Sequence, residues 1–336
     1  MDVSEFDYDL PESAIAQAAI EPRDAARLLV ADTLDDLVFT ELPSLLNEGD
    51  VVVVNNTRVR PARVHAVKTT GGKVEVLLTK RIEGARWEAL LRPARRIREG
   101  TELRAGSITM TVVDAPDRGV VTLEVAADRD LDEMLPDLGE VPLPPYFHGT
   151  LDDDERYQTM FAAEPGSAAA PTAALHFTRR IVDHFVARGI RLAEVELEVG
   201  LDTFRPMADG PIEEHDMHRE RYTVPAITAE IVNAAKRRGS RVVGIGTTVV
   251  RTLETSTDEH GIVHPGTGST DLFISPGYDV RAVDAVLTNF HAPRTTLIVM
   301  IATLIGPRWR EVYAHALASG YRFLSFGDAM YIEVDR

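Results

Sequence analysis

Between about residue 170 and residue 326, two periodicities alternate along the chain. Helical spacing of apolar residues occurs in five segments, at 179–189, 227–239, 247–255, 295–306 and 309–320. Strand-like apolar segments separate most of them, at 190–200, 241–246, 284–290 and 321–326. This alternation is typical of a mostly parallel sheet covered by helices, so it predicts an α/β fold built as a sheet or a barrel. The earlier stretch "GDVVVVNNT" (49–57) is expected to add a strand to the same sheet.

A second style of sequence occupies residues 61–128. Short runs of Val, Thr, Leu and Ile are closed by Gly, Pro and Asp, as in "SITMTVVDAPDRG". This composition predicts a small antiparallel barrel, and the breaker-rich stretch "LGEVPLPPYFHG" predicts where it ends. We therefore expect a discontinuous α/β domain, barrel-like and mostly parallel, made of residues 1–60 and 149–336, with an inserted β-barrel domain at 61–148.

Polar residues follow four of the predicted α/β strands. "NNTR" follows "VVVV", "EVGLDTF" follows "AEVEL", "GTT" follows "RVVGI", and "NFH" follows "AVLT". Ligands of parallel α/β folds bind at the carboxyl ends of the strands. Turn formation alone could explain one or two of these clusters, but four together favour a binding site on one face.

Charge is distributed unevenly. The formal net charge of −17 by itself disfavours nucleic-acid binding. Residues 55–98, however, contain 12 Lys and Arg against 3 Asp and Glu, a local excess of +9 that leaves −26 on the remainder. Such a basic island is either a solvated face or a docking surface for a polyanion.

The absence of cysteine excludes disulfides, thiolate nucleophiles and cysteine-bound metal centres. The acidic start "MDVSEFDYDL" lacks the features of a signal peptide, and the longest apolar stretch, 297–305, is shorter than the ~20 residues that span a bilayer. We expect a cytoplasmic protein without a membrane segment, either a monomer or a weak homo-oligomer.

The stretch "HDMHRE" gathers two histidines and two carboxylates at residues 215–220. On a helix, His215 and His218 share a face and Glu220 points away; on a strand, His218 and Glu220 share a face. The His-Glu-x-x-His pattern of zinc hydrolases is absent, so a metal is disfavoured. An acid–base or substrate-binding loop competes with a solvated turn. "VVGIGTT" matches a dinucleotide fingerprint only in part, and close packing of strand and helix explains it equally well.

A dozen motifs occur in a fixed order, from "FDYDLPESAIAQ" near the start to "FLSFGDAMYI" near the end. Between them lie "NNTRVRPAR", "GGKVEVLL", "PLPPY", "YQTMFA", "APTAALHFT", "VGLDTFRP", "HDMHRE", "GTTVVRTLE", "FISPGY" and "DAVLTNFHAPRTTL". Together they resemble the S-adenosylmethionine:tRNA ribosyltransferase-isomerase family of queuosine biosynthesis. The resemblance implies an α/β barrel-like domain with an inserted β-barrel, which agrees with the organisation inferred above.

The resemblance also implies a reaction that uses S-adenosylmethionine as co-substrate, with no cofactor and no metal. Its ribosyl part would pass to 7-aminomethyl-7-deazaguanine in the anticodon region of a tRNA and be isomerised, giving epoxyqueuosine, adenine and methionine. The basic island at 55–98 would dock the tRNA. Because the sulfonium acidifies the ribose C5′ proton, the reaction needs a base that titrates near neutral pH, and adenine must be protonated as it leaves.

Family motifs imply the site residues as well. Candidates for acid–base catalysis are His176, His215, His218 and His291. Substrate-binding positions are implied at Asn56, Arg58, Thr172, Thr203, Glu220, Thr247, Thr248, Arg251, Asn289, Phe290 and Asp328. Among these, Arg251 could pair with the methionine carboxylate.

The chain departs from the family pattern at several motif positions. Ala174 and Asp202 replace glycines, Glu198 replaces a histidine, Val249 replaces a serine, and the arginine expected after "PPY" is missing. Two alternatives therefore stand beside the tRNA-modifying enzyme. One is a paralogue that applies the same ribosyl chemistry to a small-molecule acceptor, and the other is a catalytically lapsed protein that binds RNA or a nucleoside.

Overall fold

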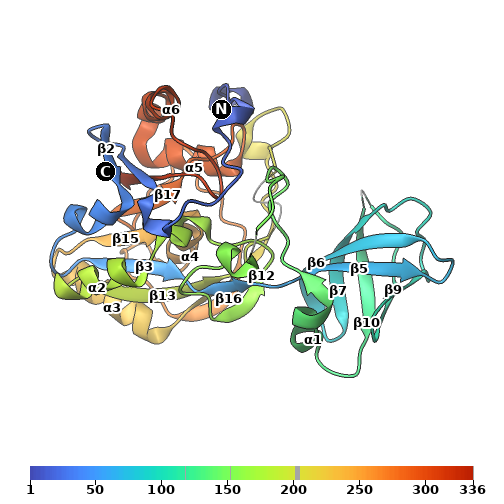
Figure 1. The fold of residues 1–336 in the computed structure, drawn as a ribbon. Coiled ribbons are helices and arrows are strands. Elements are labelled where there is room, and N and C mark those ends of the chain that lie inside the picture. The colour runs from blue at the N-terminus through green and yellow to red at the C-terminus, as the bar shows by residue number, and fades with distance from the viewer. Residues whose placement is uncertain (118, 152, 201–204, 336) are drawn as a thin grey trace. The chain divides into compact units, whose positions relative to one another are not determined.

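A computed structural model of the chain describes residues 1–117, 119–151, 153–200 and 205–335. It divides into two compact units (Figure 1). The larger consists of 1–57, 144–164 and 170–336, and the smaller of 58–143 together with 165–169. The smaller unit thus includes a short second segment, 165–169, that the sequence-based division assigned to the α/β domain.

The larger unit is built on a sheet of nine strands. Their order is β16 (Gly266–Thr270), β14 (Glu220–Val224), β13 (Arg191–Leu197), β3 (Val51–Asn55), β15 (Val242–Ile245), β17 (Ala285–Asn289), β18 (Ala329–Glu333), β1 (Arg27–Val30) and β2 (Asp35–Val38). The central strands β13, β3, β15 and β17 are parallel neighbours. The α/β class is confirmed, and the sheet is mixed rather than mostly parallel, because β14, β16, β18 and β2 add antiparallel pairings.

Strand β3 shows why the sheet is covered on both faces. Val51 and Val53 belong to one buried core and Val52 and Val54 to the other, since successive side chains of a strand point to opposite faces. One core is packed by α3 (Ala226–Arg237), α4 (Thr247–Thr255), α5 (Thr296–Ile305) and α6 (Trp309–Ala318), and the other by α2 (Arg179–Ala187) and the 3₁₀ helix Phe39–Leu45. A continuous apolar run is therefore what this position of the sheet requires.

The expected strand at 321–326 is wrong. These residues form a bend, and the last strand is β18, which begins at Ala329. The Asp328 carboxylate accepts hydrogen bonds from the Arg322 backbone N–H (2.9 Å) and from the Arg322 guanidinium (3.0 Å), which closes the chain into a loop. Gly327 sits so close to the Arg322 carbonyl that a Cβ would lie 2.3 Å from it. Tyr321 and Phe323 are buried in the hydrophobic core, which gives this loop the apolar spacing of a strand.

The smaller unit contains a closed antiparallel barrel, which confirms the predicted insert. Its six strands are β5 (Arg63–Lys68), β6 (Lys73–Glu83), β7 (Arg86–Arg92), β10 (Val120–Ala126), β9 (Ile108–Val112) and β8 (Glu102–Ala105), and the pairing of β8 with β5 closes the ring. The short β11 (Gly139–Glu140) follows α1 (Leu131–Leu138) and pairs with β5. A separate two-stranded sheet joins β4 (Thr57–Val59) to β12 (Glu164–Ser167). No helix in the described part of the chain is long and apolar enough to cross a membrane.

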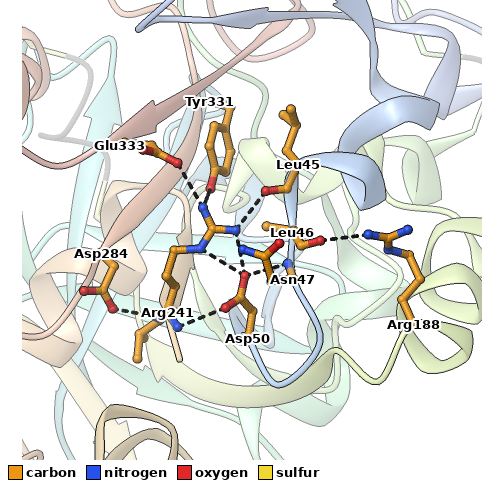
Figure 2. A network of polar contacts seen from close by, with 10 residues as sticks. Leu45, Leu46, Asn47, Asp50, Arg188, Arg241, Asp284, Tyr331 and Glu333 are labelled. Atoms are coloured by element: carbon orange, nitrogen blue, oxygen red, sulfur yellow. Dashed lines mark hydrogen bonds and ion pairs between the residues drawn. The ribbon is translucent and has the colours of Figure 1, made fainter. Parts of the chain in front are cut away.

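A buried ion pair ties together the amino-terminal edge of the central strands (Figure 2). Asp50 immediately precedes β3 and Arg241 immediately precedes β15. The Asp50 carboxylate accepts from Arg241 Nη2 (2.8 Å), Arg241 Nε (3.1 Å), the Arg241 backbone N–H (3.0 Å) and the Asn47 backbone N–H (2.9 Å). Arg241 also donates to Glu333 at the end of β18. The network therefore belongs to the edge opposite the strand ends where the polar clusters lie.

Candidate active site

The four α/β strands that precede the polar clusters end at one edge of the sheet, as predicted, although residues 201–204 of one cluster lie outside the described part of the chain. Because β13, β3, β15 and β17 are parallel and adjacent, the segments after Leu197, Asn55, Ile245 and Asn289 emerge side by side. This edge is the usual ligand-binding position of parallel α/β sheets.

A cavity of about 620 Å³, counting the part open to solvent, lies at this edge. Its lining comes from the start of α4, the end of β17, the start of α5 and the 3₁₀ helix Thr172–His176. The polar lining residues are Tyr146, Thr172, Thr247, Thr248, Thr288, Asn289, His291, Thr295 and Ser325. Its hydroxyl, amide and imidazole groups, set among apolar residues, are the lining expected of a small-molecule site.

Helix α4 presents its amino terminus to the cavity. Gly246, with φ of +87°, makes the sharp turn from β15, and Thr247 and Thr248 follow as the first helical residues. The first N–H groups of a helix have no partner within it and carry a partial positive charge, so they favour acceptor groups of a ligand. The buried Thr248 hydroxyl has no hydrogen-bond partner among the described residues.

Asn289 connects three elements at the floor of the cavity. Its side-chain oxygen accepts from the Thr172 hydroxyl (2.8 Å), while its amide nitrogen lies 3.5 Å from His176 Nε2 and 3.4 Å from the Asp328 carbonyl. His176 is buried, does not line the cavity, and packs against the Phe39 ring. Burial lowers the pKa of His176 to about 4, although the Asp328 carboxylate acts in the opposite direction.

His291 lines the cavity directly. Its Nε2 lies 3.0 Å from the Thr288 hydroxyl, and its backbone N–H contacts the Tyr313 hydroxyl at 3.0 Å. Burial lowers the pKa of His291 to about 3. The adjacent Phe290 packs on Phe323 with ring centroids 4.9 Å apart, which fixes the backbone of this segment. Near neutral pH both His176 and His291 are therefore uncharged hydrogen-bonding groups.

The "HDMHRE" stretch contributes to a second, smaller cavity of about 270 Å³, again counting the part open to solvent. His218 and Arg251 line it together with the apolar residues Met217, Leu272, Phe273, Ile274, Leu297 and Met300. Residues 215–219 precede β14 and belong to no helix or strand, and Glu220 is the first residue of that strand. The "HDMHRE" stretch is thus a loop as far as Arg219, and it forms neither the helix nor the complete strand considered from the sequence.

Glu220 links His218 to Arg251. One carboxylate oxygen lies 3.2 Å from His218 Nε2 and accepts from the Gly200 backbone N–H (2.9 Å), and the other forms an ion pair with Arg251. Burial by itself would raise the pKa of Glu220, but the hydrogen bond with His218 and the Arg251 charge hold that pKa below its usual value. His215 stands apart, with its ring edge-on to Phe273, and burial lowers its pKa.

Several predicted site residues lie outside both cavities. Asn56 donates to Glu194 on β13 (3.1 Å), Asp328 holds Arg322, and Arg58 belongs to the smaller unit. Thr203 lies outside the described residues. Conversely, Tyr146, Ser325 and Leu324 line the larger cavity without having been singled out. Their motifs "PLPPY" and "FLSF" are distinctive. The residues lie in loops, however, where no helix or strand periodicity indicates which side chains face the site.

Three departures from the family pattern, Ala174, Glu198 and Val249, lie within the described residues. Ala174 and Val249 are fully buried, and each belongs to a hydrophobic core, not to the lining of either cavity. Glu198 is partly exposed and lies 4.0 Å from Arg221 on the neighbouring strand. Asp202 lies outside the described residues.

Fold and site together define a class: an α/β protein with a polar cavity at the carboxyl edge of its parallel strands and an antiparallel barrel inserted in its chain. The match of residues 3–332 to the model of the queuosine biosynthesis protein family is more specific. The chain belongs to this family.

Two relatives agree with this assignment over the full length. An S-adenosylmethionine:tRNA ribosyltransferase-isomerase of Symbiobacterium thermophilum is 46% identical over 340 residues, which cover 99% of this chain and 100% of the relative. The crystal structure of an S-adenosylmethionine tRNA ribosyltransferase from Thermotoga maritima matches with 33% identity and a TM-score of 0.55, covering 98% of this chain and 100% of that one.

Proposed function

We propose that the chain is an S-adenosylmethionine:tRNA ribosyltransferase-isomerase. It transfers the ribosyl part of S-adenosylmethionine to 7-aminomethyl-7-deazaguanine in tRNA and isomerises it to epoxyqueuosine, with release of adenine and methionine. The observation that carries the proposal is the full-length identity of 46% to a relative of that name. The cavity with polar lining at the carboxyl edge of the sheet gives independent support.

His218 is proposed as the base that removes the C5′ proton. A general base works best when its pKa lies near the operating pH, and burial moves the pKa values of His176 and His291 far below that range. His218 instead contacts the ionised Glu220, which can orient its ring and stabilise the imidazolium that proton removal creates. Arg251 keeps that carboxylate in place.

The residues of the larger cavity are proposed to bind the adenosine part of the substrate. Neutral His291 and Asn289 can exchange hydrogen bonds with the ribose hydroxyls and the base, and the Thr248 hydroxyl offers another contact. His176 touches Asn289 from behind and is proposed to position that amide, not to contact the substrate.

Cations on the barrel are proposed to bind the anticodon region of the tRNA. Within the basic island, Arg81 and Arg86 form ion pairs with carboxylates of the barrel unit. By contrast, the exposed Lys73, Arg92, Arg95, Arg96 and Arg98 have no ion-pair partner among the described residues. Lys73 and Arg92 also line one hollow of the barrel surface, together with Glu75. Exposed cations without an ion-pair partner suit phosphate recognition.

Turnover with the modified RNA tests the proposal. The purified protein is incubated with S-adenosylmethionine, with and without an anticodon stem-loop that carries 7-aminomethyl-7-deazaguanine, and adenine and methionine are quantified. Release of both that depends on the modified base is the expected result. Binding of S-adenosylmethionine without RNA-dependent release would refute the proposed acceptor. The paralogue alternative is not favoured, because the full-length relative with 46% identity carries the name of the tRNA-modifying enzyme.

A further inference from the structure

The two cavities of the larger unit adjoin each other. Leu297, at the start of α5, lines both of them. They also follow one another along α4, since Thr248 lines the larger cavity and Arg251 the smaller one. Residues three apart on a helix are neighbours on one face, about 5–6 Å apart at Cβ. A single extended ligand can therefore reach both cavities.

Each of these two α4 residues carries a buried polar atom without a hydrogen-bond partner in the described part of the chain: the Thr248 hydroxyl oxygen and Arg251 Nη2. Arg251 is only 5% exposed. Its Nη1 donates to Glu220 and its Nε donates to the Leu272 carbonyl (3.2 Å), so Nη2 is the one donor group left over. Buried donors of a charged side chain are rarely left unsatisfied, so the pair of atoms marks positions for a ligand.

The smaller cavity has the chemistry of an amino-acid site. Met217, Phe273, Ile274 and Met300 give it an apolar, sulfur-rich wall, which suits the carbon chain and sulfur of a methionyl group. A guanidinium is the natural partner of a carboxylate. Because Glu220 already balances the charge of Arg251, the pair is neutral in sum and matches a zwitterion, which also has no net charge.

We infer that the smaller cavity binds the methionyl part of S-adenosylmethionine, with Arg251 Nη2 donating to the α-carboxylate, while the larger cavity binds the adenosyl part. The inference rests on the proposed function and adds the division of the substrate between two subsites. The bond from sulfur to C5′ then crosses the junction of the cavities. His218 lines the smaller cavity and is thereby brought to the side of the carbon that loses its proton.

Two ligands that differ by one carboxylate test this inference. Binding of S-adenosylmethionine and of decarboxylated S-adenosylmethionine is measured by calorimetry without RNA. We expect the wild type to prefer the intact ligand by about 10- to 100-fold, the value of a hydrogen bond to a charged group. The double variant Arg251→Met/Glu220→Gln should bind both ligands equally, close to the wild-type affinity for the decarboxylated one. Removing both charges avoids a buried unpaired one.

Two further variants control the measurement. Arg308→Met removes an arginine that pairs with Asp32 and lines neither cavity, so it should keep the wild-type preference. Arg251→Lys retains a cation but has a single nitrogen in place of the guanidinium fork. We expect this variant to lose most of the preference for intact S-adenosylmethionine. It therefore tests the inference even if the double variant does not fold.

Equal binding of the two ligands by the wild type, or an undiminished preference in Arg251→Lys, would overturn the inference. A wild type that binds neither ligand would instead refute the proposed function itself, and the two failures are thereby distinguished.

Discussion

Replacing Asp50 by alanine should destabilise the larger unit while leaving its chemistry intact. The substitution removes the acceptor of two guanidinium bonds and of two backbone N–H groups, those of Asn47 and Arg241. Asp50 is only 3% exposed, so these donors are poorly reached by water. Breaking a buried ion pair costs about 3–5 kcal/mol. Arg241 is 24% exposed and keeps its bonds to Glu333 and the Leu45 carbonyl, so we expect the lower end, about 3 kcal/mol.

The chain offers a specific probe for this measurement. It has two tryptophans, Trp87 in the barrel unit and Trp309 in the larger unit, so a Trp87→Phe background reports unfolding of the larger unit alone. Urea unfolding is followed by fluorescence, and kcat is measured at the same temperature. Glu333→Gln is the matched control: it removes the other carboxylate that contacts Arg241, but Glu333 is 56% exposed, and the expected loss is below about 1 kcal/mol. Equal losses for the two variants, or a large fall in kcat for Asp50→Ala, would refute the reasoning.

Three further predictions concern the site and the barrel. His176→Gln should make the stability of the larger unit less sensitive to acid. The pKa of His176 is about 4 in the folded protein and 6.5 in the unfolded chain, so the wild type loses stability as the pH falls. Between pH 7.5 and pH 5, urea titrations should show the wild type losing about 2 kcal/mol more than the variant. His218→Asn should lower kcat by about 10²- to 10⁴-fold, and turnover within threefold of wild type would exclude it as the base. Lys73→Gln and Arg92→Gln should each raise KM for the RNA and reduce the salt dependence of binding by roughly one phosphate contact, whereas the paired Arg86→Gln should change little.

Local pattern was sufficient for most elements of the larger unit. The segment expected as a helix at 247–255 is α4, from Thr247 to Thr255, because its apolar spacing and the preceding Gly246 define both its face and its start. Three of the four central strands were recognisable from short apolar runs, and β13 from its alternating apolar residues. The stretch 321–326 has similar apolar residues, yet the Asp328 carboxylate closes it into a loop. That contact depends on a side chain outside the apolar pattern, so periodicity could not detect it.

The histidines show where sequence reasoning about the site ended. His176, His215, His218 and His291 were equivalent candidates, since a motif position carries no information on burial. The fold then separates them: it buries His176 and His291, whose pKa values fall to about 4 and 3, and it places His218 against an ionised carboxylate. Desolvation and a neighbouring charge act over a few ångströms in space, and those neighbours are distant in the chain.

The sequence by itself determined the class of fold, the inserted barrel, the edge of the sheet that carries the site and the family to which the chain belongs. These follow from spacing along the chain and from ordered motifs. Only the tertiary structure decided which candidates meet. It joined Glu220 to Arg251 across 31 residues and Thr172 to Asn289 across 117, and it directed Ala174 and Val249 into the cores. Side-chain chemistry is local in the sequence, whereas cavities and charge pairs arise only when distant segments pack together.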